Sequence, residues 1–589
     1  MADTKTSTWK AFWHLFAGFW RSAHRWPALG MLAFTLACCS AKAYVFGEMI
    51  VWAGKISRLV STTEAADLVQ LPATIQEGLG LVALMVLLAS ATLFVQQSLR
   101  LRWRVWMTEC FLTRWMSDKA YYRLQAAGLD ADNPDQRISE DAGFFAEKVL
   151  DLVVGFWDKM SVAVMALLAI LAGASGDPVK IGPFLGLGPV SLATSQLFCL
   201  GCLCFYVPGT WLAHLVGRRL ISLKYEQKRR EADFRFSMMR TRENSESIAF
   251  YGGEQMELQG SRRRFAGVVE NFKALIARKT LLKSYTVFFE KMADFLPYLM
   301  LLLLILCAKT VPDNFVGLIL SCAAIKDFFS FFVNSYETLA DLAAIIRRLA
   351  NLDRSMDEAR ALPGGASLAE GAPGRFEARG LCVQLPDGRS VMQNLSLALE
   401  RGARLLVTGP SGCGKSTFLR TVSGIWPFGS GKVYKAPEER TLFLPQRPYL
   451  PLGTLRGALC YPSKPLPASE DGRLKDVLRK VDLERLVKLL DQEDDWSRIL
   501  SLGEQQRIAF ARVLLARPDW VFLDESTSAL DEEHERDMYQ LIASELPKTG
   551  IVSVGHRTTL LALHDRQLAL EGGAWSLRPL ACQPAATTA

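Results

Sequence analysis

Long apolar runs constrain the fold of this chain more than any other feature of its sequence. Half of its 589 residues are hydrophobic, and several runs approach the roughly 20 consecutive apolar residues that an α-helix needs to cross a bilayer. We therefore predict an α-helical transmembrane bundle of six spans. These are placed near residues 28–53, 79–99, 150–174, 192–216, 285–309 and 314–337.

Ionisable residues interrupt three of the predicted spans. They are Asp158 and Lys159 in the third, Glu290, Lys291 and Asp294 in the fifth, and Lys326 and Asp327 in the sixth. Such groups must face the interior of the bundle or a water-filled cavity. Two interpretations stay open: the groups line a substrate path, or they form pairs within the bundle or lie at interfacial helix ends.

Charge in the loops predicts the orientation of the bundle. The loops after the second and fourth predicted spans are rich in arginine and lysine, whereas the opposite loops are short and nearly balanced. Basic loops stay in the cytoplasm, so the N-terminus is predicted to be cytoplasmic as well. These loops account for the net charge of +8, and no nucleic-acid partner is predicted.

The first 26 residues are predicted to form an amphipathic helix along the inner leaflet. Aromatic residues recur there at helical spacing, opposite Lys10 and His14: they are Trp9, Phe12, Trp13, Phe16 and Trp20. The segment is not predicted to be a signal peptide, because the first long apolar run begins only after Arg25.

A glycine-rich segment in the second half of the chain has the spacing of a Walker A phosphate loop. It consists of Gly409, Pro410, Ser411, Gly412, Cys413, Gly414, Lys415, Ser416 and Thr417. Glycines let backbone N–H groups curl around phosphate oxygens, the lysine reaches the terminal phosphates, and the serine hydroxyl can ligate Mg²⁺. An apolar run precedes the loop, a helical pattern follows it, and residues 520–525 read as a Walker B strand. We predict an α/β P-loop domain that binds ATP and Mg²⁺.

Three further motifs stand in a fixed order around the Walker B strand. Residues 500–507 precede it, residues 528–531 follow it, and His556 closes the series. This order resembles the ATPase domain of ABC transporters.

The resemblance implies a role for each residue around the hydrolysed phosphate. It implies that Gln446 contacts Mg²⁺ and the attacking water, and that Asp524 holds Mg²⁺ through water. It implies that Glu525 is the general base and that His556 contacts the γ-phosphate. Positioning and charge stabilisation are what phosphoanhydride hydrolysis requires, so these groups suffice.

The signature segment, residues 500–507, departs from the usual Leu-Ser-Gly-Gly-Gln. It has Leu502 in place of the first glycine and Glu504 in place of the glutamine, whereas Ser501 and Gly503 are retained. The resemblance implies that Ser501 and Gly503 touch the γ-phosphate from the opposite subunit. It also places Glu504 and Asp531 among the ATP-binding residues, with Asp531 at the dimer seam.

The usual adenine-stacking aromatic is also missing. No aromatic residue stands between Phe376 and the phosphate loop, and Leu385 lies near the expected place.

A Gly/Pro/Ala-rich stretch, residues 361–374, marks a domain boundary. We predict an interfacial helix at 1–26, the six-span domain with long cytoplasmic helical loops at 27–352, a linker at 353–374 and the nucleotide-binding domain at 375–589. The chain has one bundle and one ATPase, whereas ATP sites of this type lie between two ATPase domains. A half-transporter that pairs with a second copy of itself is therefore predicted.

The cytoplasmic loops carry a narrower resemblance, on residues 102–108, 121–124, 132–138, 243–253 and 443–449. Together they look like bacterial transporters whose membrane half resembles the SbmA/BacA peptide-uptake proteins, with peroxisomal ABCD half-transporters as more distant relatives. This implies an exporter-type fold that imports bulky hydrophilic cargo such as cobalamin, bleomycin or antimicrobial peptides. It also implies a bacterial cytoplasmic (inner) membrane, with the ATPase domain cytoplasmic.

Two other functions share these features. An ATP-driven exporter of drugs, lipids or fatty acyl compounds has the same ATPase motifs and fold, and differs in the loops and in the direction of transport. A proton-driven carrier with a regulatory ATPase would keep transporting when hydrolysis is blocked. The predicted spans exclude a soluble ABC ATPase of translation or repair.

Overall fold

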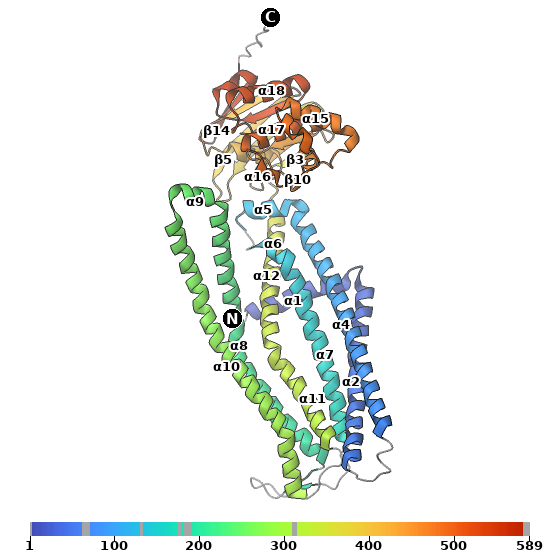
Figure 1. Ribbon diagram of the computed structural model, residues 1–589. Helices are drawn as coiled ribbons and strands as arrows, with labels where there is room; N and C mark the ends of the chain where they lie inside the picture. Colours follow the sequence, from blue (N-terminus) through green and yellow to red (C-terminus); the bar gives the residue numbers. More distant parts are fainter. Residues whose placement is uncertain are drawn as a thin grey trace. The chain divides into compact units, whose positions relative to one another are not determined.

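The computed structural model describes residues 3–61, 71–129, 133–172, 179–181, 190–192, 194–308 and 315–580. The chain divides into two compact units (Figure 1). Unit 1 comprises Met1–Arg114 and Ala131–Arg354, and unit 2 comprises Trp115–Asp130 and Ser355–Ala589.

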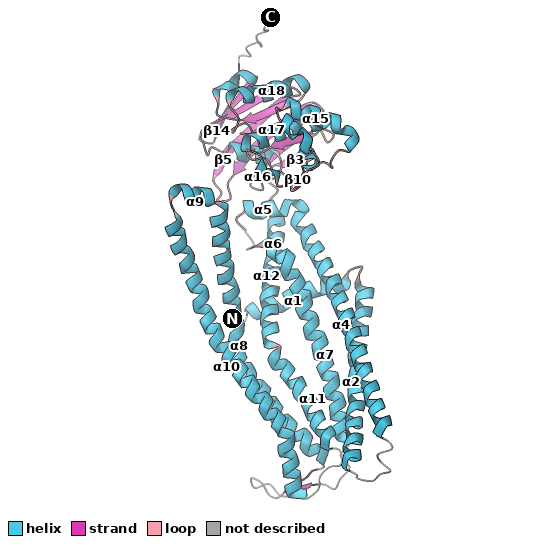
Figure 2. Ribbon diagram, viewed as in Figure 1, coloured by secondary structure: helices cyan, strands magenta, loops and turns pink. Residues whose placement is uncertain are grey.

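Unit 1 is helical through nearly all of its described part, as the cyan ribbons of Figure 2 show. One short antiparallel pair joins β1 (Val179–Ile181) to β2 (Val190–Leu192). The helices are α1 (Asp3–Arg21), α2 (Arg25–Ser61), α4 (Leu71–Met116), α6 (Pro134–Gln136), the π-helical turn η2 (Arg137–Asp141), α7 (Ala142–Ala172), α8 (Thr194–Glu243), α9 (Ser245–Tyr251), α10 (Glu254–Ala308), α11 (Phe315–Asn334) and α12 (Tyr336–Ala361).

Within the described residues, five helical segments are long and apolar enough to cross a membrane. They are Arg25–Ile56, Leu71–Ala126, Pro134–Leu171, Cys199–Glu243 and Val316–Ala361. Each overlaps one of the predicted spans. The remaining prediction is residues 285–309. Its residues 285–308 fall in α10, where Glu290, Lys291 and Asp294 interrupt the apolar run, and residue 309 lies outside the described residues.

An apolar core joins α7, α8, α10 and α11 in unit 1. The ring of Phe289 on α10 stacks on Phe205 of α8 at 5.4 Å, and Tyr206 beside it is fully buried. The Tyr206 hydroxyl donates to the carbonyl oxygen of Cys322 on α11, at 3.4 Å. A buried tyrosine needs such a partner, so this bond fixes α8 against α11.

The aromatic stripe of α1 packs partly against unit 1. Phe19 is fully buried and stacks on Trp103 of α4, with the ring centroids 5.2 Å apart. Phe12 lies 6.1 Å from Phe145 of α7, whereas Trp9 remains 62% exposed. The predicted helix exists, and part of its apolar face is covered by protein rather than left for lipid.

Unit 2 contains two larger sheets with helices packed on them, drawn in magenta and cyan in Figure 2. Its helices are η1 (Ser117–Lys119), α5 (Ala120–Ala126), α13 (Lys415–Val422), α14 (Leu455–Cys460), η3 (Ala468–Glu470), α15 (Asp471–Lys480), η4 (Glu484–Leu489), α16 (Trp496–Ile499), α17 (Leu502–Ala516), α18 (Glu532–Glu545) and η5 (Thr558–Leu563). Its strands are β3 (Ser367–Glu370), β4 (Arg375–Gln384), β5 (Ser390–Glu400), β6 (Arg404–Thr408), β7 (Gly429–Lys435), β8 (Thr441–Leu444), β9 (Gly453–Thr454), β10 (Glu493–Asp494), β11 (Trp520–Asp524), β12 (Gly550–Val554), β13 (Arg566–Glu571) and β14 (Ala574–Pro579).

The six-stranded sheet has the order β14-β13-β6-β12-β11-β8. Its five strands from β13 to β8 are parallel, and only β14 pairs antiparallel. The second sheet has the order β3-β7-β4-β5, and one apolar core includes residues of both sheets. There Phe522 of β11 stacks on Phe443 of β8 at 4.5 Å and lies 5.3 Å from Phe376 of β4. The predicted fold class, a helical membrane bundle plus an α/β P-loop domain, is confirmed.

Two segments differ from the predicted domain limits. The predicted linker begins inside α12, which continues to Ala361, and it contains β3, which pairs in parallel with β7. The segment Trp115–Asp130 lies within the predicted membrane domain but belongs to unit 2, where Ala126 packs against the apolar core. Sheet pairing and core contacts, which composition does not reveal, produce both differences.

The start of β12 offers a test of core packing. A Cβ atom on Gly550 would lie 2.2 Å from the ring of Trp520, which is fully buried and cannot move aside. We expect Gly550→Ala to destabilise unit 2 by about 1–3 kcal/mol, as overpacked cores do. Gly472→Ala is the matched control, because nothing lies within 4 Å of a Cβ at that exposed helical position. The thermal unfolding midpoint of the purified chain should fall for Gly550→Ala alone; an unchanged midpoint contradicts the prediction.

Candidate functional site

The phosphate loop joins β6 to α13 in a backbone path that requires glycine. Gly409 has a φ of +150° and Gly414 a φ of +98°. A Cβ would lie 2.4 Å from the carbonyl oxygen of Leu570 at the first position and 2.0 Å from Val391 at the second. Gly412, with a φ of +80°, faces open space.

Lys415 is the first residue of α13 and is only 6% exposed. Its Nζ atom donates to the carbonyl oxygens of Gly409 and Pro410, each at 2.9 Å. The first N–H groups of a helix have no partner within the helix, and together with this ammonium group they favour an anion at the loop.

Ser416 lies next to the carboxylate at the end of β11. Its Oγ atom donates to Oδ1 of Asp524 at 2.9 Å. Burial raises the pKa of Asp524 above its ordinary value, and the bond from Ser416 opposes that shift. A bound cation would offset the burial of this carboxylate.

Both groups supply oxygen, the donor that Mg²⁺ prefers. In the described part of the chain no cluster of three or more His, Cys, Asp or Glu side chains could hold a metal by itself. Mg²⁺ needs no such cluster, because it takes one or two protein ligands and completes its shell with waters and substrate phosphates. The pair Ser416 and Asp524 therefore fits this ion.

Glu525 lies at the centre of a contact between three strand ends. The Nε2 atom of Gln446 donates to its Oε2 at 3.0 Å, and Nε2 of His556 lies 3.2 Å from its Oε1. Gln446 follows β8, and His556 follows β12; both strands pair in parallel with β11. The φ of Glu525 is +47°, a left-handed conformation that costs a non-glycine residue about 1–3 kcal/mol and is typical of functional sites.

The signature segment and the residues after it form separate contacts. Ser501 is the N-cap of α17, and Asp531 is the N-cap of α18. Gly503 approaches the chain after β11 so closely that a Cβ would lie 3.1 Å from the carbonyl oxygen of Ala529. Within the described part, no hydrogen bond or ion pair joins Ser501, Gly503, Glu504 or Asp531 to the phosphate loop or to Glu525.

The sequence analysis did not single out Gln506, a residue of α17 that connects the signature helix to the segments after β8 and β11. Its side chain is fully buried. Its Nε2 atom donates to the carbonyl oxygen of Gln446 at 3.1 Å and to Oγ of Ser528 at 3.2 Å, while Oε1 accepts from the N–H of Ala529 at 3.0 Å. A polar residue at a buried position of a helix was the available signal.

Leu385 is half-buried and packs against the core of unit 2. An aliphatic side chain thus lies near the position expected for the adenine-stacking aromatic residue. It can contact an adenine ring but cannot stack on it as an aromatic ring does.

The ionisable residues of the predicted spans are mostly paired with one another. Asp158 pairs with Lys42 at 2.6 Å, Asp294 with Lys326 at 2.7 Å and with Lys291 at 3.4 Å, and Lys159 with Asp327 at 3.7 Å. Among the described residues Glu290 forms no ion pair. Of the two interpretations left open by the sequence, pairing within the bundle is the one that these contacts support.

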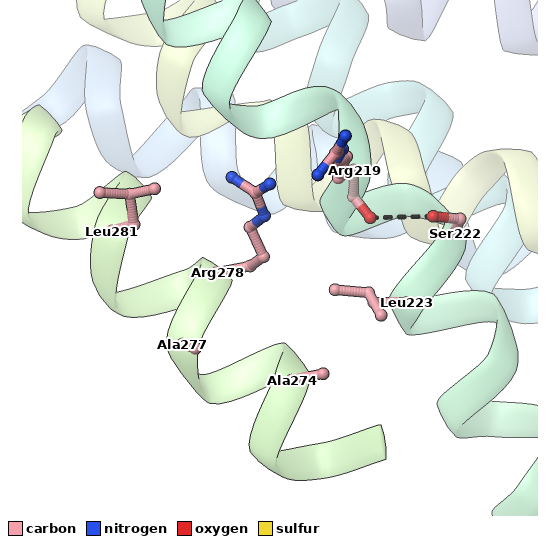
Figure 3. Close-up of a pocket in the computed structure, with 7 residues that line it drawn as sticks. All are labelled: Arg219, Ser222, Leu223, Ala274, Ala277, Arg278 and Leu281. Atoms are coloured by element: carbon pink, nitrogen blue, oxygen red, sulfur yellow. Dashed lines mark hydrogen bonds between the residues drawn. The ribbon is translucent and has the colours of Figure 1, made fainter. Parts of the chain in front are cut away.

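A groove of about 630 Å³ lies between α8 and α10. Figure 3 shows Arg219 and Arg278 on its two walls above the small side chains of Ala274 and Ala277. Its described lining contains two arginines and no acidic residue. The positive charge of these arginines favours anionic groups at this surface.

Comparison with known proteins covers both units. Residues 19–306 match the model of the ABC transporter transmembrane region 2 family, and residues 392–528 match that of the ABC transporter family.

Three relatives extend the similarity over most of the chain. The ABC transporter D family member 2, chloroplastic, of Arabidopsis thaliana is 32% identical over 81% of this chain and 74% of the relative. The inner membrane ABC transporter ATP-binding protein YddA of Escherichia coli is 31% identical over 82% and 84%. The lysosomal cobalamin transporter ABCD4 of Homo sapiens is 28% identical over 84% and 85%. With its membrane region, its phosphate loop and these relatives, the chain belongs to the ABC transporters, as a half-transporter related to the D family that hydrolyses ATP to drive transport.

Proposed function

We propose that Glu525 is the general base of ATP hydrolysis and that Gln446 and His556 position the reactants around it. The contact of both side chains with the two carboxylate oxygens of Glu525 carries this proposal. A carboxylate held at a strand end can polarise a water, and a mobile imidazole or amide beside it can follow the γ-phosphate.

The phosphate loop and the end of β11 complete the site. Lys415 contacts the terminal phosphates when it exchanges its two carbonyl partners for phosphate oxygens. Ser416, Asp524 and Gln446 are the groups that would hold Mg²⁺, which when bound neutralises charge that develops on the phosphates.

A second copy of the chain supplies the rest of the ATP site in this proposal. Ser501 and Gly503 lie at the N-terminus of α17, with Asp531 at the N-terminus of α18. None of them contacts the phosphate loop of its own chain in the described residues, which supports a role at the nucleotide of a partner. Sandwiching of ATP between two copies makes the half-transporter a homodimer.

We further propose that the dimer imports bulky hydrophilic compounds across a bacterial cytoplasmic membrane. The cytoplasmic loops support this by their resemblance to the SbmA/BacA-like uptake transporters. One relative is named as an inner membrane protein and another as a cobalamin transporter. Cobalamin, bleomycin and antimicrobial peptides are the cargo candidates, and export of drugs, lipids or fatty acyl compounds is the opposing outcome.

The base role predicts the effect of Glu525→Gln. The variant should bind ATP but lose turnover by about 10²-fold or more, because a neutral amide cannot take the proton of the attacking water. ATPase rate and retained nucleotide are measured on the purified chain. Glu438→Gln, at an exposed turn, is the control and should hydrolyse normally. Near-normal hydrolysis by Glu525→Gln removes this residue from the base role.

Mixing two inactive variants tests the shared site. Lys415→Ala removes the phosphate contact of one copy, and Ser501→Arg blocks the contribution of the other. In a mixed dimer both defects fall in one ATP site and leave the second intact, so a 1:1 mixture should recover up to about a quarter of the wild-type ATPase rate. If the mixture stays inactive, or if monomers hydrolyse ATP at full rate, the sandwich proposal is wrong.

The direction of transport is tested in cells and in liposomes. Cells that lack the protein should resist bleomycin-like or cationic-peptide toxins, or fail to grow on limiting external cobalamin, and Glu525→Gln should reproduce the loss. Hypersensitivity of the deleted strain, or ATP-dependent extrusion of lipophilic dyes by the purified protein, establishes export instead. Uptake that continues in Glu525→Gln points to the proton-driven carrier.

A further inference from the structure

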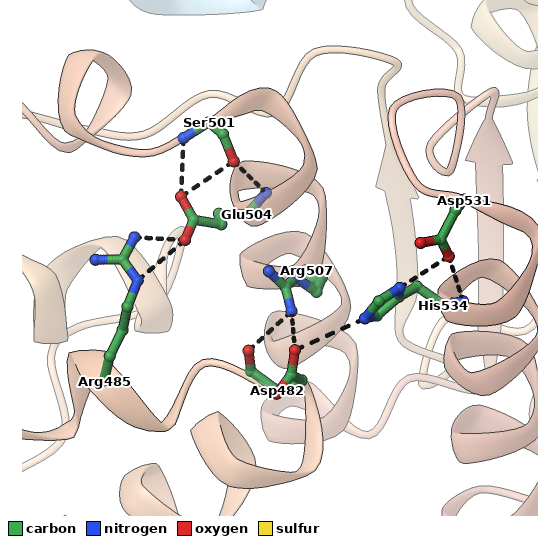
Figure 4. A network of polar contacts seen from close by, with 7 residues as sticks. All are labelled: Asp482, Arg485, Ser501, Glu504, Arg507, Asp531 and His534. Atoms are coloured by element: carbon green, nitrogen blue, oxygen red, sulfur yellow. Dashed lines mark hydrogen bonds and ion pairs between the residues drawn. The ribbon is translucent and has the colours of Figure 1, made fainter.

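The glutamate that replaces the usual glutamine of the signature segment is bound back onto its own helix. The Oε2 atom of Glu504 accepts from the N–H and from the hydroxyl of Ser501, each at 3.0 Å (Figure 4). The Ser501 hydroxyl in turn accepts from the N–H of Glu504 at 3.3 Å. Within this capping box, the hydroxyl that the proposed function assigns to the partner's phosphate donates to Glu504.

Arg485 of η4 holds the other oxygen of the same carboxylate. Its Nε atom donates to Oε1 of Glu504 at 3.1 Å, and its Nη2 atom donates to the same oxygen. The side chain of Glu504 is 16% exposed, and that of Arg485 is 55% exposed. Burial alone would raise the pKa of Glu504, but the bonds from Arg485 and Ser501 outweigh it and keep the pKa below its usual value.

The segment that carries Arg485 is itself fixed on α17. Arg507 lies one helical turn after Glu504, and its Nη1 atom donates to the carbonyl oxygen of Asp482 at 2.8 Å and to Oδ2 at 2.5 Å. His534 of α18 lies 3.7 Å from the same carboxylate and contacts Asp531 at 2.8 Å (Figure 4). Residues 482–485 therefore contact the signature helix at two successive turns, through Asp482 and through the side chain of Arg485.

This arrangement solves an electrostatic problem. A carboxylate one turn into α17 would repel the triphosphate that Ser501 and Gly503 are proposed to receive. A glutamine at this position would cap the helix equally well without the charge. Neutralisation of Glu504 by Arg485 removes the repulsion and keeps the cap.

We propose that Arg485 is a positioning residue of the ATP site, which compensates the charge of Glu504 so that the signature segment can receive the γ-phosphate of a second copy. The inference rests on the proposed sandwich of two copies. Arg485 acts through Glu504 and touches no substrate itself.

The test is a double-mutant cycle on the full-length protein in lipid nanodiscs. Arg485→Ala should raise the KM for ATP by about 5-fold, the size expected of a partly exposed charge pair, with kcat at saturating ATP nearly unchanged. Glu504→Gln is the reference background, in which Arg485→Ala should have no further effect on the KM for ATP. High salt should shrink the defect of the single variant, because screening weakens the repulsion.

Arg479→Ala is the matched control. It removes another exposed arginine of the same region, whose Nε atom lies 3.2 Å from Oε1 of Glu484, and it should leave the KM unchanged. If Arg485→Ala does not fold, Arg485→Gln makes the same comparison, because it keeps a hydrogen-bond donor without the charge.

The outcomes separate this inference from the proposed function. The role of Arg485 is overturned if Arg485→Ala leaves the KM for ATP unchanged. It is also overturned if Arg485→Ala raises the KM equally whether residue 504 is Glu or Gln. If Ser501→Arg impairs ATP use while Arg485→Ala does not, only this inference fails. If Ser501→Arg has no effect either, the signature segment is not part of an ATP site and the sandwich proposal fails with it.

Discussion

Parallel pairing of β6, β12, β11 and β8 is the constraint on which the proposed ATP site depends. Parallel neighbours end at the same edge of a sheet, so the residues after each strand meet there. The phosphate loop, Gln446, Glu525 and His556 come from four separate stretches of sequence and follow these four strands. Their chemistry needs fixed distances, and the ladder of hydrogen bonds between the strands sets them.

Burial of the central strand turns this edge into a rigid support. Every residue of β11 from Trp520 to Leu523 is fully buried. Asp524, at the end of the strand, accepts a hydrogen bond from the Ser416 hydroxyl. The close approach of Gly550 to Trp520 locks β12 against β11. Core packing therefore stabilises the strained backbone of Glu525, whose left-handed conformation would not persist on a mobile loop.

In the membrane region, the ionisable residues of the predicted spans form ion pairs between helices. Charged residues in the predicted spans find partners on neighbouring helices, as Asp158 does with Lys42 and Asp294 with Lys326. Paired charges are cheaper to hold among apolar helices than isolated ones, so these contacts join the helices.

The sequence by itself determined the helical membrane region and the P-loop domain, because local hydrophobic period and glycine spacing encode them directly. It did not determine that β3 and the segment Trp115–Asp130 join unit 2, that Gln506 links Gln446 to Ala529, or that Arg485 neutralises Glu504. Those contacts join residues that are distant along the chain or lie on different elements. Only the packing of the sheets and of α17 decided them, since no local pattern records which side chain will be opposite another once the chain has folded.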